Sequence, residues 1–173
     1  MDFRIRPFVE DDLPAIVDLS LTAWEPVFVS FRKLLGPGIF ALIYPDWRKS
    51  QQEGVEQTCR TGGKVQVLVA DCGGKAVGFI AFELKGNTGE VLLLAVHPDH
   101  QNQGIGTALN VAALEAMKHA GVALVEVGTG GDESHAPARR SYAKAGYTAL
   151  PLVRYYIDLQ SPGEHDAPGV PAT

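Results

Sequence analysis

The sequence is poor in cysteine and has no excess of basic residues. It contains two cysteines in 173 residues, and Cys59 and Cys72 fit no metal-binding spacing, which argues against a disulfide scaffold and favours a reduced, cytoplasmic chain. Fifteen Lys and Arg against twenty Asp and Glu give a net charge of −5, so nucleic acid is not expected as a partner. An acidic chain favours cationic small molecules or side chains instead.

Long apolar runs are also missing. No segment approaches the ~20 apolar residues that cross a bilayer, and the N-terminus has no signal-peptide pattern, so we expect neither membrane insertion nor secretion. The length favours one domain over residues 1–159. Residues 160–173 contain prolines and no aromatic residue, which predicts a disordered tail. The oligomeric state is left open, with a homodimer as one alternative.

Apolar periodicity predicts an α/β fold. Period-two or continuous apolar patterns mark strands at residues 3–9, 65–69, 77–82, 90–96, 122–127 and 152–159. The run at 90–96 is apolar after its first residue, which predicts a central strand covered on both faces. Helical spacing marks residues 13–24, which Pro26 should end, then a short helix at 28–35, a turn at 36–38, and helices at 39–59, 104–120 and 136–145.

The most informative segment follows the apolar strand. It reads Gln101-x-x-Gly104-x-Gly106 at the start of a predicted helix. Unpaired N–H groups and the positive end of the helix dipole make such a terminus an anion site, and glycines allow close approach of a phosphate. The nucleotide P-loop pattern fails because no Gly-Lys-Ser/Thr follows, and the dinucleotide pattern fails because the third glycine is missing.

This segment resembles the signature Gln/Arg-x-x-Gly-x-Gly/Ala of the GNAT superfamily of acetyl-CoA-dependent N-acyltransferases. The preceding Leu-Ala-Val-His-Pro is similar to the end of that family's central strand. The segment from Ala138 to Tyr147 is similar to its Ala-x-x-x-Tyr-x-Lys-x-Gly-Phe/Tyr helix end, and the segment from Val153 to Leu159 to its closing strand. The resemblance implies a mixed, mostly antiparallel sheet of about six to seven strands, flanked by about four helices, with a splayed central strand.

The resemblance also implies where acetyl-CoA binds. The pantetheine would lie against the main chain of the splayed strand, at Leu94, Ala95 and Val96. The pyrophosphate would lie on the loop formed by Asn102, Gln103, Gly104, Ile105, Gly106 and Thr107. Because backbone N–H groups would hold the phosphates, the two glycines should matter more than the other side chains.

Two residues are candidates for the chemistry. Tyr142 corresponds to the family's helix-end tyrosine, whose phenol can protonate a leaving thiolate, whereas a half-buried structural tyrosine is the alternative. Glu90 lies six residues before Val96, where some family members carry the base that deprotonates the incoming amine; a solvated strand start is the equally weighted alternative. Glu126 and a water chain remain competitors for the base.

One position departs from the family pattern. Many relatives carry an Asn near the start of the last helix that bonds the pantetheine, and this chain has His135 there, seven residues before Tyr142. Cofactor contact or a capping role both fit a histidine. The preceding loop, residues 128–134, is longer than in compact members, and the acids and histidines at 97–100 and 132 match no metal-ligand spacing, so no metal is expected.

The function implied is an acyltransferase that moves an acetyl group from acetyl-CoA to a primary amine by direct attack in a ternary complex. The amine would belong to a small molecule, a protein lysine or an N-terminus, and the acidic residues Glu25 and Glu90 favour a cationic acceptor. By resemblance, the segment around Trp24, Glu25 and Phe28 and the closing strand near Tyr155 are expected to line the acceptor side, with core packing as the alternative for the aromatic residues. A catalytically silent acyl-CoA-binding module is the competing function.

Overall fold

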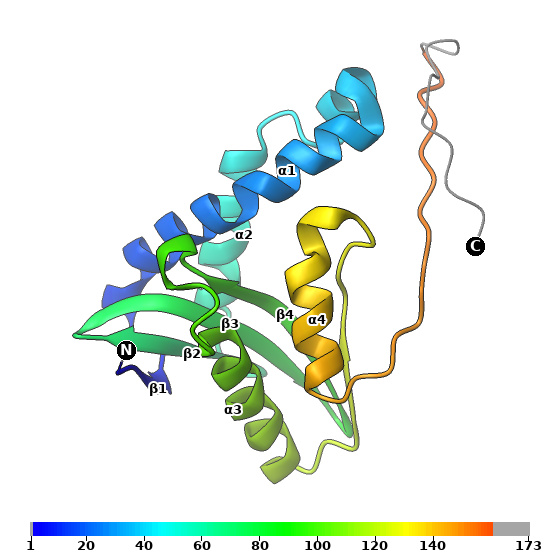
Figure 1. Ribbon diagram of the computed structural model, residues 1–173. Coiled ribbons are helices and arrows are strands. Elements are labelled where there is room, and N and C mark those ends of the chain that lie inside the picture. Colours follow the sequence, from blue (N-terminus) through cyan, green and yellow to red (C-terminus); the bar gives the residue numbers. More distant parts are fainter. Residues whose placement is uncertain (1, 161–173) are drawn as a thin grey trace.

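The computed structural model describes residues 2–160 and shows one sheet with helices on both faces (Figure 1). The sheet has five strands in the order β1-β2-β3-β4-β5: β1 (Arg4–Pro7), β2 (Val65–Cys72), β3 (Lys75–Lys85), β4 (Thr88–Val96) and β5 (Leu124–Val127). The first four strands are antiparallel neighbours, and β5 runs parallel to β4. The helices are α1 (Leu13–Ile43), α2 (Trp47–Arg60), α3 (Ile105–His119) and α4 (Ala136–Lys144).

Two apolar clusters fill the layers on either side of the sheet. One joins α1 and α2 to the sheet through residues such as Ile16, Val55 and Phe79. The other joins α3 to the opposite face through Ile80, Phe82 and Leu109. The predicted meander and the predicted helix at 104–120 are therefore confirmed, and β3 rather than β4 occupies the middle of the five strands.

The prediction that Pro26 ends the first helix is wrong. α1 continues through Pro26 to Ile43, and the break comes at Gly36, whose φ of 72° and ψ of 162° are not helical. A proline removes one helical hydrogen bond, and the burial of Val27 and Phe28 in the next turn holds the helix together. The predicted turn at 36–38 is thus a kink, and the predicted helix at 39–59 is interrupted before Trp47.

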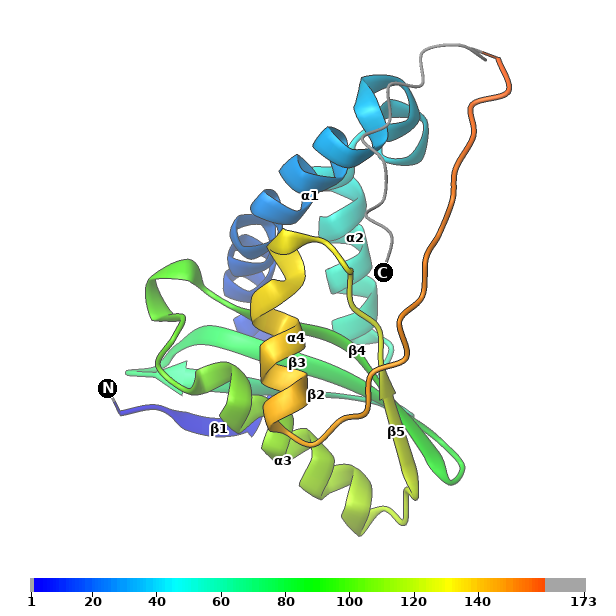
Figure 2. The ribbon, with the colours of Figure 1, turned by 45° about the vertical axis from the view of Figure 1, so that its right-hand side comes forward.

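The prediction of a closing strand at 152–159 is also wrong. These residues are extended but pair with no strand among residues 2–160, and Leu152, Tyr155 and Leu159 are 80% or more exposed. Figures 1 and 2 show the segment running from the end of α4 away from the sheet. Pro151 has no amide hydrogen to donate to a ladder. The sheet accordingly has five strands rather than six or seven, and the predicted tail after Gln160 lies outside the described residues.

The first helix is long and apolar. Together with the preceding turn η1 (Glu10–Asp12) it forms a 34-residue stretch, Glu10–Ile43, that passes the length and composition test for a membrane span, with 11% of its most apolar window buried. Its N-terminal half packs Leu13, Ile16 and Leu19 into the core beside the sheet. The absence of a membrane span stays a prediction, because length and composition are shared by core helices and spanning helices.

A buried ion cluster ties the start of α1 to the sheet. Arg6 on β1 donates to both oxygens of Asp12 at 2.7 Å and, through Nε, to Asp71 on β2 at 2.7 Å. Asp12 and Asp71 are only 6% and 4% exposed. Arg6 therefore neutralises two carboxylates that would otherwise be buried as unpaired charges.

Candidate active site

The fourth strand contains a β-bulge at Leu92. On β3, Phe82 pairs with Val91 and the next residue, Ala81, pairs with Leu93, so Leu92 is an extra residue. Pairing with β5 stops at the same place: it runs from Thr88–Leu124 to Val91–Val127, while β4 continues to Val96. The predicted splayed strand is therefore present, and its last five residues have no strand neighbour on the β5 side within residues 2–160.

The open edge presents the main chain of Leu94 and Val96. The His97 N–H donates to the Val77 carbonyl on β3 at 2.9 Å. In an antiparallel strand the main-chain groups of alternate residues point to opposite edges, so those of Leu94 and Val96 point away from β3, whereas those of Ala95 point toward it. The Val96 carbonyl accepts a hydrogen bond from Gln101 Nε2 at 3.1 Å, which leaves the main chain of Leu94 and the N–H of Val96 as pairing groups on this edge.

A turn and a glycine loop connect this edge to α3. The turn η2 (Pro98–His100) is followed by Asn102, which has a φ of 59°, and by Gly104, which has a φ of 84°. Gln103 Nε2 donates to the Asp99 carbonyl at 3.3 Å and fixes the loop from within. Gly104 is the N-cap of α3 and has no side chain to offer the helix N–H groups, so these groups face solvent.

The free N–H groups belong to the first turn of the helix. The first α3 bond runs from Ala108 N to Gly104 O, so the N–H groups of Ile105, Gly106 and Thr107 have no intrahelical acceptor. Ile105 is 1% exposed, and its side chain belongs to the core while its amide stays at the terminus. A Cβ on Gly106 would meet only Val96 Cγ2, at 3.7 Å. The loop thus has the shape and polarity of an anion site.

Tyr142 lies near the C-terminal end of α4. Its ring packs edge-on against Tyr147, with ring centroids 5.6 Å apart, and Tyr147 in turn donates to Asn110 Oδ1 on α3 at 3.3 Å. Burial, and secondarily the neighbouring Tyr147, raises the pKa of Tyr142 to about 12. The phenol therefore keeps its proton throughout the physiological pH range.

Glu90 is engaged in an ion pair in this structure. Its carboxylate lies 2.5 Å from Lys85 Nζ and is 32% exposed, and Lys85 also contacts Glu83 at 3.2 Å. Glu83, Glu90 and Glu126 stand opposite one another on three neighbouring strands. The sequence analysis identified Glu90 and Glu126 of this row. It did not identify Glu83 or Lys85, which pairs with Glu83 and Glu90.

His135 begins α4 and is held by an acid from the preceding loop. Its Nδ1 lies 2.6 Å from Asp132 Oδ1. Ser30 on α1 and Ser134 also donate to Asp132 Oδ2, the former at 2.7 Å. Burial would raise the pKa of Asp132, but the hydrogen bonds from Ser134, Ser30 and His135 outweigh burial and lower it to about 2. Sequence reasoning missed this pair, although the i, i+3 spacing of Asp132 and His135 at a helix start was visible.

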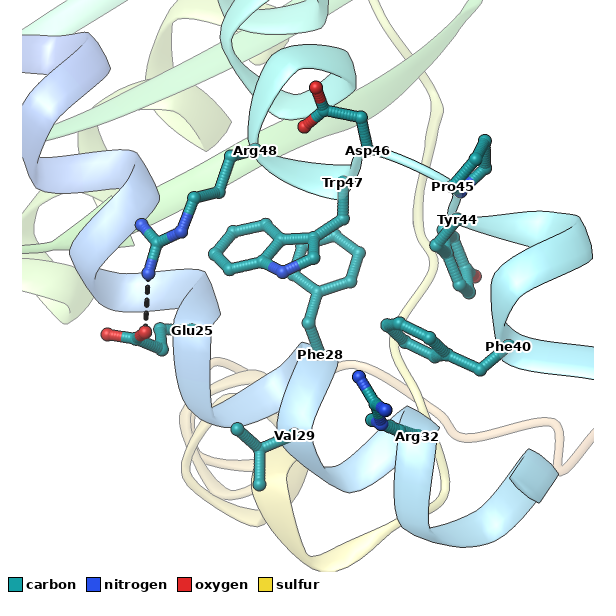
Figure 3. Close-up of a pocket in the computed structure, with 10 residues that line it drawn as sticks. All are labelled: Glu25, Phe28, Val29, Arg32, Phe40, Tyr44, Pro45, Asp46, Trp47 and Arg48. Atoms are coloured by element: carbon teal, nitrogen blue, oxygen red, sulfur yellow. Dashed lines mark hydrogen bonds and ion pairs between the residues drawn. The ribbon is translucent and has the colours of Figure 1, made fainter. Parts of the chain in front are cut away.

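An aromatic cavity of about 310 Å³ opens between α1 and α2 (Figure 3). Trp47 stacks on Phe28 with centroids 4.3 Å apart, and Arg48 lies over the Trp47 ring while pairing with Glu25. Of the residues expected at the acceptor side, Glu25 and Phe28 line this cavity. Trp24 packs on the core instead, and Tyr155 is 82% exposed, so neither lines it.

The aromatic contacts continue from this cavity to the loop before α4. Phe31 stacks on Tyr44 at 5.8 Å and on the His135 ring at 5.6 Å. Figure 2 shows the N-terminal end of α4 beside α1. Residues 2–160 contain no cluster of His, Cys, Asp and Glu that could hold a metal ion, and the expectation of a metal-free site stays a prediction.

Comparison with known proteins identifies the family. A family model described as an acetyltransferase (GNAT) domain matches residues 63–149, which is half of the chain. The chain belongs to the GNAT acetyltransferase family. The match includes β2 to α4, and so the bulged strand, the glycine loop and Tyr142.

Relatives and solved structures agree with this assignment. A mycothiol acetyltransferase of Sanguibacter keddieii is 34% identical over 107 residues, which cover 58% of this chain and 32% of that protein; the chain thus spans about a third of that relative's length. The PaiA N-acetyltransferase of Thermoplasma acidophilum, solved with coenzyme A, has a TM-score of 0.67 at 18% identity, covering 88% of this chain and 94% of that one. A GNAT acetyltransferase of Brucella melitensis, solved with acetyl-CoA, has a TM-score of 0.60 at 22% identity over 86% and 84% of the two chains. This GNAT protein therefore has the fold of acetyltransferases that bind coenzyme A.

Proposed function

We propose that this protein transfers an acetyl group from acetyl-CoA to a primary amine by direct attack within a ternary complex. The observation that carries the proposal is the bulge at Leu92, after which β4 leaves β5 and exposes a strand edge. That edge leads through the glycine loop directly to the N-terminus of α3. One continuous path thus offers main-chain pairing groups first and anion-binding N–H groups next.

The donor groups on this path match the parts of acetyl-CoA. The amide-containing pantetheine arm can pair with the main chain of Leu94 as an added strand would. The pyrophosphate can accept from the N–H groups of Ile105, Gly106 and Thr107. When bound, acetyl-CoA supplies an activated acyl carbon with a thiolate leaving group.

The acceptor must reach this edge as a free amine. An alkylammonium with a pKa near 10.4 has no lone pair at neutral pH, so one of its protons must leave before attack. The chain's net charge of −5 favours a cationic acceptor. The cavity lined by Glu25, Phe28 and Trp47 supplies an apolar wall for such a molecule, and Glu25 is paired there with Arg48.

Release of free coenzyme A thiol tests the proposal. The purified protein is mixed with acetyl-CoA and a panel of primary amines that includes polyamines, aminoglycosides and lysine-containing peptides. We expect thiol release that depends on both the amine and the protein, and mass spectrometry should show an acceptor heavier by one acetyl group. Tight acetyl-CoA binding without acetylation of any amine would instead identify a silent acyl-CoA-binding module.

The pyrophosphate assignment predicts the effect of Thr107→Glu. Thr107 is exposed at the third position of α3, where a carboxylate stabilises a helix by about 0.3–1 kcal/mol through the helix dipole. The same carboxylate would compete with a pyrophosphate for the free N–H groups. We expect an unchanged or higher Tm together with a dissociation constant for coenzyme A at least about tenfold weaker, measured by calorimetry.

Thr107→Gln is the matched control because it has the same size and no charge. It should bind coenzyme A nearly as the parent does. If Thr107→Glu and Thr107→Gln bind equally well, the phosphates do not lie at this helix terminus. Gly104→Val is a poorer probe, since a φ of 84° strains any side chain there even though nothing lies within 4 Å of its Cβ.

A further inference from the structure

The loop between β5 and α4 builds an imidazole–carboxylate pair from three parts of the chain. Asp132 comes from the loop, His135 begins α4, and Ser30 reaches Asp132 from α1, 102 positions earlier. Arg139 Nη1 donates to the carbonyls of Gly130 and Asp132, both at 2.6 Å, and holds the loop in place. A helix cap requires one hydrogen bond from the capping side chain to a backbone N–H group. The Asp132 side chain makes hydrogen bonds with the side chains of Ser30, Ser134 and His135, which is more than a cap requires.

The pair fixes which imidazole nitrogen is free. Asp132 is an ionised carboxylate and can only accept, so Nδ1 of His135 carries the proton that bonds to it. Nε2 then bears the lone pair, and no residue between 2 and 160 hydrogen-bonds to it. A carboxylate that orients a histidine in this way prepares Nε2 to accept a proton.

The surroundings hold the ring and leave part of the side chain exposed. The His135 side chain is 16% exposed, and one face of its ring is stacked on Phe31. The Gly130 backbone packs closely against both members of the pair. A Cβ at this position would lie 2.5 Å from His135 Nδ1 and 2.6 Å from Asp132 Oδ1. The ring therefore has one fixed orientation, and Phe31 connects it to the aromatic cavity through Tyr44.

The pair and the turn that follows the proposed acetyl-CoA edge both contact the same helix, α1. α1 contacts both η2, which continues β4 into the glycine loop, and η3 (Glu133–His135), which carries His135. In contrast, the rival carboxylate Glu90 stands six residues before Val96, about 20 Å along an extended strand, and is paired with Lys85. The Glu90 carboxylate is thus already engaged by a cation, whereas no residue between 2 and 160 hydrogen-bonds to His135 Nε2.

We propose that His135 Nε2 is the general base that takes a proton from the acceptor ammonium, with Asp132 as the residue that positions it. The inference rests on the proposed acetyl transfer. The nitrogen loses one proton to His135 and forms the N–C bond as the thioester C–S bond breaks. The second nitrogen proton ends on the sulfur to give the thiol, and His135 releases its proton to solvent. Asp132 is the charged side chain that faces the imidazole; Arg139 contacts backbone carbonyls of the same loop.

The test compares the pH dependence of kcat/KM in four variants with the best amine from the panel. His135→Asn keeps a side chain that can hydrogen-bond to pantetheine, as the Asn of many family members does, but it cannot accept a proton at neutral pH. We expect a loss of kcat/KM on the order of 10²-fold at pH 7 that shrinks toward pH 9, because the free amine fraction rises tenfold per pH unit. The coenzyme A dissociation constant should stay unchanged.

The other variants distinguish a proton-accepting role of His135 from the positioning role of Asp132 and from the alternative base Glu90. Asp132→Asn should lower kcat/KM by a smaller factor than His135→Asn, with the same dependence on pH. Gly130→Ala should have an effect similar to that of Asp132→Asn, because the added Cβ displaces the pair. Glu90→Gln should lack the selective loss of kcat/KM at low pH. Imidazole added to His135→Ala should restore part of the rate.

Two results would overturn the base assignment while leaving the proposed function intact. One is a parallel loss, or no loss, for His135→Asn between pH 6 and pH 9, which would indicate a cofactor contact or a structural role. The other is a low-pH defect confined to Glu90→Gln. If the parent protein acetylates no amine, the proposed function fails instead, independently of His135.

Discussion

Replacing Tyr142 by Phe should lower kcat by about 10²- to 10³-fold while leaving coenzyme A binding nearly unchanged, because the change removes a single preorganised hydrogen-bond donor. The phenol is fixed by its edge-on contact with Tyr147 and by burial. Phe keeps the ring and its packing. Single-turnover measurement of thiol release, with the dissociation constant from calorimetry, gives both quantities.

The raised pKa decides what kind of donor Tyr142 is. A phenol with a pKa of about 12 cannot readily hand its proton to a thiolate whose own pKa is near 8.5. We therefore expect Tyr142 to stabilise the charge on the departing sulfur through a hydrogen bond and to keep its proton. The activity of the parent protein should accordingly show no loss from Tyr142 ionisation as the pH rises toward 10.

Tyr147→Phe is the matched control for this prediction. It removes a phenol of the same type that bonds to Asn110 on α3, so it should lower stability slightly and leave kcat close to that of the parent. Equal kcat values for Tyr142→Phe and the parent, with a substrate for which chemistry limits the rate, would remove Tyr142 from the mechanism.

The largest effect on stability is expected for Arg6→Ala. The change strands Asp12, which is 6% exposed, without its partner. Breaking a buried ion pair from one side costs about 3–5 kcal/mol, and the lower end applies because the Arg6 side chain is itself 21% exposed. Urea unfolding of both proteins at pH 7 measures the difference. Arg60→Ala is the control, because its pair with Glu10 is exposed on both sides, and it should unfold close to the parent.

The difference in unfolding free energy between the parent and Arg6→Ala should also depend on pH. Hydrogen bonds from Arg6 hold the pKa values of Asp12 and Asp71 below the usual 3.8. A carboxylate with a lowered pKa in the folded state contributes stability above its ordinary pKa, and this contribution is lost as the pH falls through the folded value. The gap between the parent and Arg6→Ala should therefore be widest at neutral pH and narrow below about pH 4. A gap that is constant with pH would mean that Arg6 acts through packing.

Local signals in the sequence were sufficient for most of the fold. Gly121 and Gly146 both adopt positive φ just after α3 and α4, next to the predicted ends of the helices at 104–120 and 136–145. The signal failed where tertiary packing decides the outcome: Pro26 lies in a helix that buried neighbours maintain. The apolar pattern at 152–159 is suited to a strand, but a strand also needs a partner edge, and no local pattern encodes that partner.

The site residues likewise fall into those that the local sequence pattern revealed and those that depend on contacts between distant segments. Gly104 and its loop were recognisable because backbone anion sites depend on a contiguous glycine pattern. The bulge at Leu92 leaves no mark in a run of three leucines and had to be inferred from family resemblance. The Asp132–His135 pair depends on Ser30 and on close approach of Gly130, two contacts that join separate segments of the chain.

The extra residue at Leu92 also reverses the phase of the pleat in β4. Val91 and Leu93 are two positions apart and would ordinarily lie on the same face, yet Val91 packs with the α3 cluster and Leu93 with the α1 cluster. Within the apolar run of β4, alternate side chains that pack toward α3 before the bulge are therefore followed, at the same spacing, by side chains that pack toward α1 after it. In a regular strand Glu90 would share the α3 face with Leu94 and Val96. With the phase reversed, its carboxylate emerges on the α1 side, so a single inserted residue determines which layer of the protein receives the charge.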